Sequence, residues 1–313
     1  MKQLLRSTTA YRAVRAEAER KDLFPAALVV FADGKYLRAL LKECAKAFFL
    51  ADDGSRTAEL IEQESYLDCL FYPAEGGKLT ADDCSAILEE ALLSPVEGED
   101  KLFVLDNFHA ATPLVQNKLL KSLEEPPRGV HFLLGAEAEH SVLPTVLSRV
   151  KRYTVPPFSE EAIARALSRK YLGGAGIQEA AAASGGIFSV AESLLAGGGE
   201  EFRLAEEFLA LRDTERFCRE VGERKNKREF LAALKSLLRD MLFLRTGQGK
   251  YAARGSEGAK RLAEEYPAGA ILAALELVTE AEKQIQFNAG FASCLYALAL
   301  GVREEKIKWQ KLS

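Results

Sequence analysis

The sequence is poor in the residues that build metal centres and redox sites. Only five cysteines and three histidines occur among 313 residues, and no two cysteines form a C-x-x-C pair. No histidine has a second histidine or a cysteine at metal-ligand spacing, so a zinc knuckle and a dithiol redox motif are excluded. An odd number of cysteines in so long a chain is typical of reduced thiols in the cytoplasm. We therefore expect a cytoplasmic protein without a bound metal.

Long apolar segments and a strong charge of either sign are also missing. No run reaches the length of a membrane-spanning helix, and residues 1–22 lack the apolar core of a signal peptide, so we expect no membrane partner. The formal net charge of −4 argues against a whole-chain polyanion binder, although a local basic patch stays open. With 48% apolar and 28% charged residues, the composition is typical of a globular protein with two or three domains.

The first half of the chain alternates short apolar runs with amphipathic helical segments. The apolar runs lie at 26–32, 66–72, 101–106, 130–135 and 151–155. Several of them are apolar at consecutive positions, as expected for strands buried on both faces of a parallel sheet. Threonine is a common helix N-cap, and proline is favoured at the first helical position. Thr80, and Thr112 with the proline that follows it, therefore indicate helix starts between the apolar runs. The pattern predicts a doubly wound α/β domain up to about residue 155.

From Ser159 onward the pattern becomes helical. Ser159 can cap a helix, residues 158–195 form a short helical group rich in small residues, and no convincing strand follows. Beyond a run of three glycines come four longer amphipathic segments, at about 200–221, 227–245, 267–287 and 288–311. The second half is therefore expected to be a helical bundle, and it holds few candidate catalytic groups.

The stretch VVFADGKYLRALL, which joins the first apolar run to a helical pattern, contains part of a phosphate-binding loop. A complete loop reads G-x-x-x-x-G-K-[ST]; its backbone N–H groups cradle phosphate and its hydroxyl binds magnesium. Gly34 and Lys35 match the G-K pair. Val29 occupies the position of the first glycine, Tyr36 replaces the hydroxyl residue, and the connection is too short to wrap a triphosphate.

The third apolar run ends in Asp106, where a magnesium-holding acid belongs in such folds. The next residue is Asn107, an amide that cannot act as a general base. Elsewhere the sequence holds no G-x-S-x-G elbow and no self-contained catalytic set. We therefore interpret Gly34, Lys35, Asp106 and Asn107 as the remnant of a nucleotide site, and we expect no bound cofactor.

Three motifs follow one another in the stretch 101–163. An apolar run ends in Asp106, LLKSLEEPP occupies 119–127, and LPTVLSRV occupies 143–150. Their order and spacing resemble those of motifs in the AAA+ subunits of the bacterial DNA polymerase III clamp loader. In those subunits a strand of four hydrophobic residues (h) and an aspartate, hhhhD, is followed by L-L-K-x-L-E-E-P-P and then by L-P-T-h-x-S-R-C. The resemblance is specific over about 80–160 and weaker toward the N-terminus.

The resemblance implies a fold in three parts. Residues 1–155 would form an α/β AAA+ domain with a RecA-like parallel sheet and a degenerate phosphate loop. Residues 156–200 would form a helical lid. Residues 201–313 would form an all-α collar, through which subunits assemble into a ring.

Departures from the family pattern resemble its delta-prime members, which keep the fold and do not turn over ATP. The hydrolysing subunits carry an intact phosphate loop, a four-cysteine zinc module and Asp-Glu at the third strand, and this sequence has none of the three. Gly135–Ala136 and Ser189–Val190 stand where active members place nucleotide-sensing groups. The resemblance therefore implies a component of the DNA polymerase III holoenzyme without ATPase activity of its own.

One charged motif of the family is present, Ser148–Arg149. In the family, this arginine projects into the ATP site of the neighbouring subunit as an arginine finger, and the serine positions the motif. A guanidinium supplied in trans can stabilise the charge that develops on the transferred phosphoryl group. The alternative interpretation is that Arg149 caps its helix or pairs with a surface acid.

The resemblance also implies the partners of this chain. They are the gamma/tau-type ATPase subunits and the clamp-opening delta subunit, with weak contact to the sliding clamp and primed DNA within the assembly. Two other functions stay open. A catalytically active AAA+ clamp-loader ATPase of the gamma/tau type predicts saturable binding of a fluorescent ATP analogue by the isolated chain. An inactive AAA+ scaffold outside replication predicts no association with clamp-loader ATPase subunits.

Overall fold

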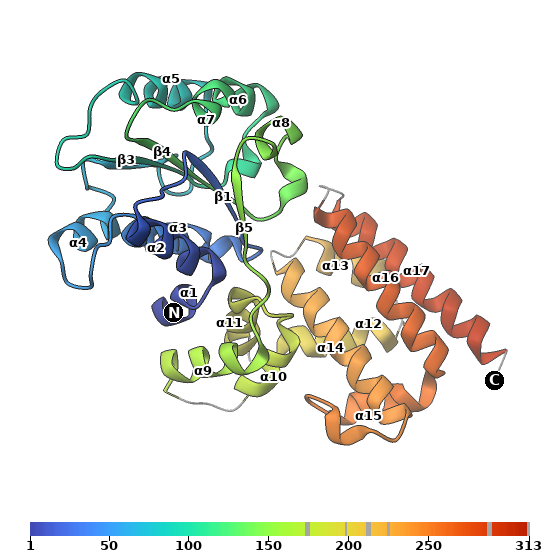
Figure 1. Ribbon diagram of the computed structural model, residues 1–313. Helices are drawn as coiled ribbons and strands as arrows, with labels where there is room; N and C mark the ends of the chain where they lie inside the picture. Colours follow the sequence, from blue (N-terminus) through green and yellow to red (C-terminus); the bar gives the residue numbers. More distant parts are fainter. Residues whose placement is uncertain (173–175, 198, 211–213, 224–225, 287–289, 312–313) are drawn as a thin grey trace. The chain divides into compact units, whose positions relative to one another are not determined.

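The chain forms two compact units, Met1–Pro157 and Phe158–Ser313, in the computed structural model (Figure 1). The structure describes all residues except 173–175, 198, 211–213, 224–225, 287–289 and 312–313. The first unit is an α/β domain, and the described part of the second unit contains helices and no strand. The fold class expected from the sequence, an α/β domain with a parallel sheet followed by helical regions, is confirmed, and its assignment to the AAA+ proteins stays a prediction.

A five-stranded parallel sheet forms the centre of the first unit. Its strands are β1 (Ala26–Val30), β2 (Cys69–Tyr72), β3 (Lys101–Leu105), β4 (Val130–Ala136) and β5 (Lys151–Thr154), in the order β2-β3-β4-β1-β5. Every residue of β1 and β3 is buried, which explains why these runs are apolar at consecutive positions. Because all strands are parallel, their carboxyl ends meet at one edge, and ligands of such sheets bind there.

Helices cover both faces of this sheet. They are α1 (Lys2–Arg6), α2 (Thr9–Arg20), α3 (Gly34–Phe48), α4 (Arg56–Glu62), α5 (Ala81–Glu90), α6 (Pro113–Lys118), α7 (Leu120–Glu124) and α8 (Pro144–Leu147), with short 3-10 turns at Phe108–Ala110 and Glu139–Ser141. Figure 1 shows α5, α6 and α7 on one side of the sheet and α2, α3 and α4 on the other. Thr80 forms a capping box with Asp83, and Thr112 caps α6 ahead of Pro113, as the sequence predicts.

The described part of the second unit is a helical bundle with one shared core. Its helices are α9 (Glu160–Lys170), α10 (Ile177–Ala183), α11 (Phe188–Ala196), α12 (Glu200–Ala210), α13 (Thr214–Gly222), α14 (Lys227–Arg245), α15 (Glu257–Glu265), α16 (Ala268–Gln286) and α17 (Phe291–Gln310), with a 3-10 turn at Gly249–Tyr251. Ser159 caps α9 as predicted. The core joins side chains of α10 and α11 to those of α12 to α17. The division into a lid and a collar at about residue 200 stays a prediction.

Two helical segments of the second unit differ from the sequence-based expectation. The segment expected at about 200–221 consists of two helices, α12 and α13, and the residues between them, 211–213, lie outside the described part. The helix α15 was not predicted, because only Ala259, Leu262 and Ala263 are buried on it and the apolar stripe is short.

Candidate functional site

The turn between β1 and α3 is the place where a phosphate-binding loop would lie. Only residues 31–33 separate the two elements, and α3 begins at Gly34. Val29 lies inside β1, fully buried, and pairs with both β4 and β5. It is therefore a core residue of the sheet rather than part of a loop. Lys35 is exposed, and its ammonium group lies 5.5 Å from the centroid of the Tyr36 ring.

A carboxylate that sequence reasoning did not single out lies against the start of α3. Glu137 directly follows β4, and a Cβ atom added to Gly34 would lie 2.1 Å from Glu137 Oε1. The Glu137 backbone N–H donates to His109 Nδ1 over 3.4 Å, and His109 Nε2 lies 3.9 Å from Glu137 Oε1. Negative groups are stabilised at a helix N-terminus, because the N–H groups there carry partial positive charge. The sequence signal that could have found Glu137 is a charged residue directly after a buried strand.

Asp106 follows β3 and meets the side chain of Arg38, which belongs to α3. Arg38 Nη1 lies 3.3 Å from Asp106 Oδ2, and the Asn107 backbone N–H donates to Asp106 Oδ1 over 2.8 Å. Burial raises the pKa of the Asp106 carboxyl above its usual value, and Arg38 and the Asn107 N–H offset part of that rise. The structure thus brings Asp106 beside α3 and gives it a guanidinium as its partner.

Arg38, itself buried, lies at the centre of a group of charges that also includes the partly buried residues Glu64 and Lys42. Its Nε and Nη2 atoms donate to the two carboxylate oxygens of Glu64 over 2.7 and 2.6 Å, and its Nη1 atom donates to the Pro73 carbonyl over 3.1 Å. Lys42 Nζ lies 3.0 Å from Glu64 Oε1, so two cations face the carboxylates of Glu64 and Asp106. Sequence reasoning missed Arg38 because Glu64 and Asp106 are 26 and 68 residues away along the chain.

Arg149 follows α8 at the surface of the first unit. Its Nε atom donates to Glu124 Oε2 over 2.7 Å, and its Nη1 atom donates to the Thr145 carbonyl over 3.0 Å. The Ser148 hydroxyl donates to the same carbonyl over 3.1 Å. About a third of the Arg149 side chain, 32%, is exposed. The first unit by itself therefore shows the helix-end and surface-acid contacts of the alternative interpretation, and the role in trans stays a prediction.

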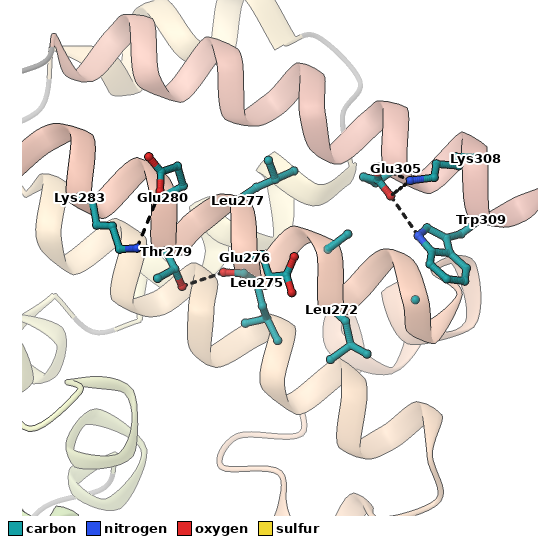
Figure 2. A pocket seen from close by; sticks show the side chains of 12 residues that line it. Leu272, Leu275, Glu276, Leu277, Thr279, Glu280, Lys283, Glu305, Lys308 and Trp309 are labelled. Carbon is teal, nitrogen blue, oxygen red and sulfur yellow. Dashed lines mark hydrogen bonds and ion pairs between the residues drawn. The ribbon is translucent and has the colours of Figure 1, made fainter.

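A surface pocket lies between α16 and α17 in the second unit (Figure 2). Leu272 and Leu275 come from α16, and Trp309 comes from α17. The Trp309 Nε1–H donates to Glu305 Oε2 over 3.0 Å, and Leu272 is half exposed. Apolar side chains with charged neighbours along the rim are a composition typical of protein-contact surfaces.

Neither a metal cluster nor a reactive thiol was found in the described part of the chain. No group of three or more His, Cys, Asp or Glu residues gathers there in a way that could hold a metal ion. The five cysteines are buried and form no disulfide, and burial raises the pKa of Cys84 to about 11, which disfavours the nucleophilic thiolate. Of the helices described, none is both long and apolar enough to cross a bilayer.

Comparisons with known proteins point to one group of replication proteins. Residues 7–159 match the family model described as "DNA polymerase III, delta subunit". The chain is 31% identical over 108 residues to DNA polymerase III subunit tau/gamma of Haemophilus influenzae, which is 34% of this chain and 16% of that protein. It is 29% identical over 136 residues to DNA polymerase III subunit delta' of Bacillus subtilis, which is 42% of this chain and 41% of that protein.

Solved structures give a similarity that extends over most of the chain. A DNA polymerase III, gamma subunit-related protein of Thermotoga maritima is 19% identical, with 95% of this chain and 99% of that chain covered and a TM-score of 0.46. The matched region spans less than half the length of either curated relative. Residues 7–159, just under half of the chain, are thus similar to the DNA polymerase III delta-subunit family.

Proposed function

We propose that this chain is a non-hydrolysing, delta-prime-like clamp-loader subunit that supplies Arg149 in trans to a neighbouring ATPase subunit during sliding-clamp loading. The proposal rests on a difference in exposure between residues of the first unit. Arg149 lies at the surface with a third of its side chain exposed, whereas Val29 and Arg38 are buried at the chain's own nucleotide edge. The family match over residues 7–159 supports the setting in DNA replication.

Three features of the nucleotide edge support the absence of ATP turnover by this chain. Val29 belongs to the sheet, so the short turn offers fewer backbone N–H groups than a complete phosphate loop. Tyr36 replaces the Ser or Thr that would ligate magnesium, and Arg38 pairs with Asp106, the acid that would hold the cation. The residues present do not fit a magnesium-bound triphosphate, so Gly34 and Lys35 are interpreted as a degenerate loop.

The contacts of Arg149 are compatible with a role in a neighbouring site. Its acidic partner Glu124 is half exposed, and an exposed ion pair of this kind contributes only about 0.2–1 kcal/mol. A phosphoryl group with several negative oxygens competes well against one such carboxylate. An arginine finger accelerates phosphoryl transfer by about 10³–10⁵-fold, far more than the ion pair costs to break.

The proposed assembly contains other clamp-loader subunits. Gamma/tau-type subunits would provide the ATP site that Arg149 completes, and a delta-type subunit would open the clamp. The helices within residues 201–313, with the pocket between α16 and α17, would act as the collar that joins the subunits. Contact of this chain with the sliding clamp and primed DNA would be weak and would occur within the assembly, in the cytoplasm.

Steady-state ATP hydrolysis tests the proposal. The chain is mixed with gamma/tau-type and delta subunits, sliding clamp and primed DNA, and hydrolysis is compared for wild type and Arg149→Ala. We expect the wild type to stimulate hydrolysis and Arg149→Ala to lower the rate at least tenfold, while size-exclusion chromatography shows an intact complex. Normal stimulation by Arg149→Ala would make the finger assignment wrong.

Arg152→Ala is the matched control for this experiment. Arg152 lies on β5 only three residues away, is also exposed, and pairs with the acid Glu139 over 3.6 Å. Loss of an exposed positive charge alone would therefore affect both variants equally. We expect Arg152→Ala to stimulate hydrolysis as well as the wild type.

An active gamma/tau-like ATPase is the second candidate, because curated relatives with that name match residues of this chain at up to 31% identity. It requires saturable binding of a fluorescent ATP analogue by the isolated chain. We expect no such binding. The third candidate is an inactive AAA+ scaffold that acts outside DNA replication. Co-elution of this chain with a gamma/tau-type subunit would exclude that function.

A further inference from the structure

The edge of the sheet where a nucleotide would bind holds a charge pattern that resembles a filled site. A magnesium nucleotide brings a cation to the acid after the third strand and negative phosphate oxygens to the start of the first helix. In this chain a guanidinium lies at the first place and a carboxylate at the second. Arg38 meets Asp106, and Glu137 meets Gly34.

The cation position is filled in a way that leaves Arg38 little freedom. Only 9% of Arg38 is exposed, and its guanidinium is held by the fork to Glu64 and by the Pro73 carbonyl as well as by Asp106. A buried carboxylate needs a compensating charge, and Arg38 supplies it to Asp106. A divalent cation at Asp106 would face this fixed positive charge at short range, which disfavours its binding.

The anion position is filled from β4. The Glu137 carboxylate lies so close to the Gly34 backbone that any side chain there would collide with it unless the carboxylate moved. The helix that starts at Gly34 has 15 residues, so its N-terminus attracts negative charge. His109 lies next to the same carboxylate, with Nε2 3.9 Å from Glu137 Oε1. A phosphate group would have to displace Glu137 to reach this place.

We infer that the chain has replaced both charges of a magnesium nucleotide by its own side chains, Arg38 for the cation and Glu137 for the phosphate. The inference rests on the proposed function, in which this chain does not bind ATP. It adds that the chain's own side chains stabilise the nucleotide edge. Magnesium binding would require the removal of Arg38, and phosphate binding would require the removal of Glu137. The first unit is accordingly equally stable with and without nucleotide and magnesium.

Magnesium rescue tests the role of Arg38 in the isolated full chain. We expect Arg38→Met to lower the midpoint of thermal unfolding, because Asp106 then lacks its buried partner. Added magnesium chloride should raise the midpoint of Arg38→Met by several degrees and leave wild type and the Arg38→Met/Asp106→Asn double variant unchanged. An Arg38→Met variant without a magnesium response, or a wild type that responds equally, would overturn the cation substitution.

Pyrophosphate binding tests the role of Glu137 and does not depend on whether Arg38→Met folds. Isothermal titration of the full chain should give saturable pyrophosphate binding to Glu137→Ala, at least tenfold tighter than to wild type. Glu137→Asp is the matched control, since it keeps the negative charge, and it should bind as weakly as wild type. Equal binding by all three proteins, or none by Glu137→Ala, would overturn the anion substitution. Both tests use this chain alone, so their failure is separable from a failure of the trans role of Arg149.

Discussion

At the scale of single residues, the two arginines Arg149 and Arg38 differ in how firmly their partners hold them. Arg149 pairs with the exposed acid Glu124, and such a pair contributes about 0.2–1 kcal/mol. Arg38 is buried and donates two hydrogen bonds to the partly buried Glu64, and it also pairs with the buried Asp106. Arg149 can therefore exchange its partner for a phosphoryl group, whereas Arg38 is a fixed part of the first unit.

Removal of Glu124 should make Arg149 more available to a neighbouring subunit. We expect Glu124→Ala to increase the stimulation of a gamma/tau-type ATPase by about two- to fivefold at limiting concentrations of this chain, because an ion pair of about 0.2–1 kcal/mol no longer competes. Glu125→Ala is the control, since the neighbouring residue Glu125 is also an exposed acid. Reduced stimulation by Glu124→Ala would show that Glu124 positions Arg149 instead of competing for it.

The pair of Arg38 and Glu64 should make the free energy of unfolding depend on pH in the acidic range. Hydrogen bonding from Arg38 lowers the pKa of Glu64 below its unfolded value of 4.5, so the pair contributes stability above pH 4.5. That contribution is lost as the pH falls through the lower folded pKa. Urea unfolding should therefore show that the free energy of unfolding falls less between about pH 5 and about pH 3 for Glu64→Gln than for wild type. The exposed residue Glu75 provides the control, and Glu75→Gln should keep the wild-type loss.

At the scale of elements, the packing of α3 on the sheet decides the geometry of the candidate site. The helix approaches β4 at Gly135, where an added Cβ atom would lie 2.6 Å from Leu41 Cδ1 and 3.3 Å from Leu37 Cδ1. Both leucines are fully buried. The absence of a side chain at position 135, which the sequence suggested only as a missing nucleotide sensor, therefore has a packing reason.

A methyl group at position 135 should disturb this helix–sheet contact. We expect Gly135→Ala to lower the free energy of unfolding by about 1–3 kcal/mol, because overpacking forces side chains or the backbone to shift. Gly98→Ala is the control, since its Cβ atom would meet nothing closer than 4.0 Å. Urea denaturation measures both changes. An unchanged Gly135→Ala would mean that Leu41 and Leu37 rearrange without cost.

At the scale of the whole molecule, each of the two units has a hydrophobic core of its own. One core joins β1, β3 and β4 to α5, α6 and α7 and lies wholly within the first unit. The other runs from α10 to α17 within the second unit. Since a domain is stabilised mainly by its own buried apolar surface, we expect the first unit to fold without the second.

A fragment of residues 1–157 should fold without the rest of the chain. We expect it to show the circular dichroism of an α/β domain and a single cooperative urea transition. The full chain in the same buffer is the reference, and its first unit should be protected from proteolysis to the same degree. A fragment that is largely unfolded would show that the second unit stabilises the first.

Much of the fold could be predicted because its determinants are local. The consecutive apolar residues of β1 and β3 indicate buried strands wherever they occur in a chain. Thr80, Thr112 and Ser159 cap helices by accepting from the N–H group three residues further on, so short stretches of sequence suffice to place these helix starts. The helix α15 could not be predicted in this way, because its few buried residues form too short an apolar stripe. Their burial follows from packing against helices that are distant in the sequence.

Sequence patterns are enough to predict the strands and the main helix starts, and they single out Gly34, Lys35, Asp106 and Arg149. Which charges meet, by contrast, depends on the folded chain. Arg38 reaches Asp106 across 68 residues, and Glu137 reaches Gly34, because parallel strands bring their carboxyl ends to one edge of the sheet. The physical reason is that local backbone and packing preferences act over a few residues, whereas ion pairing depends on distances that exist only after the sheet has formed.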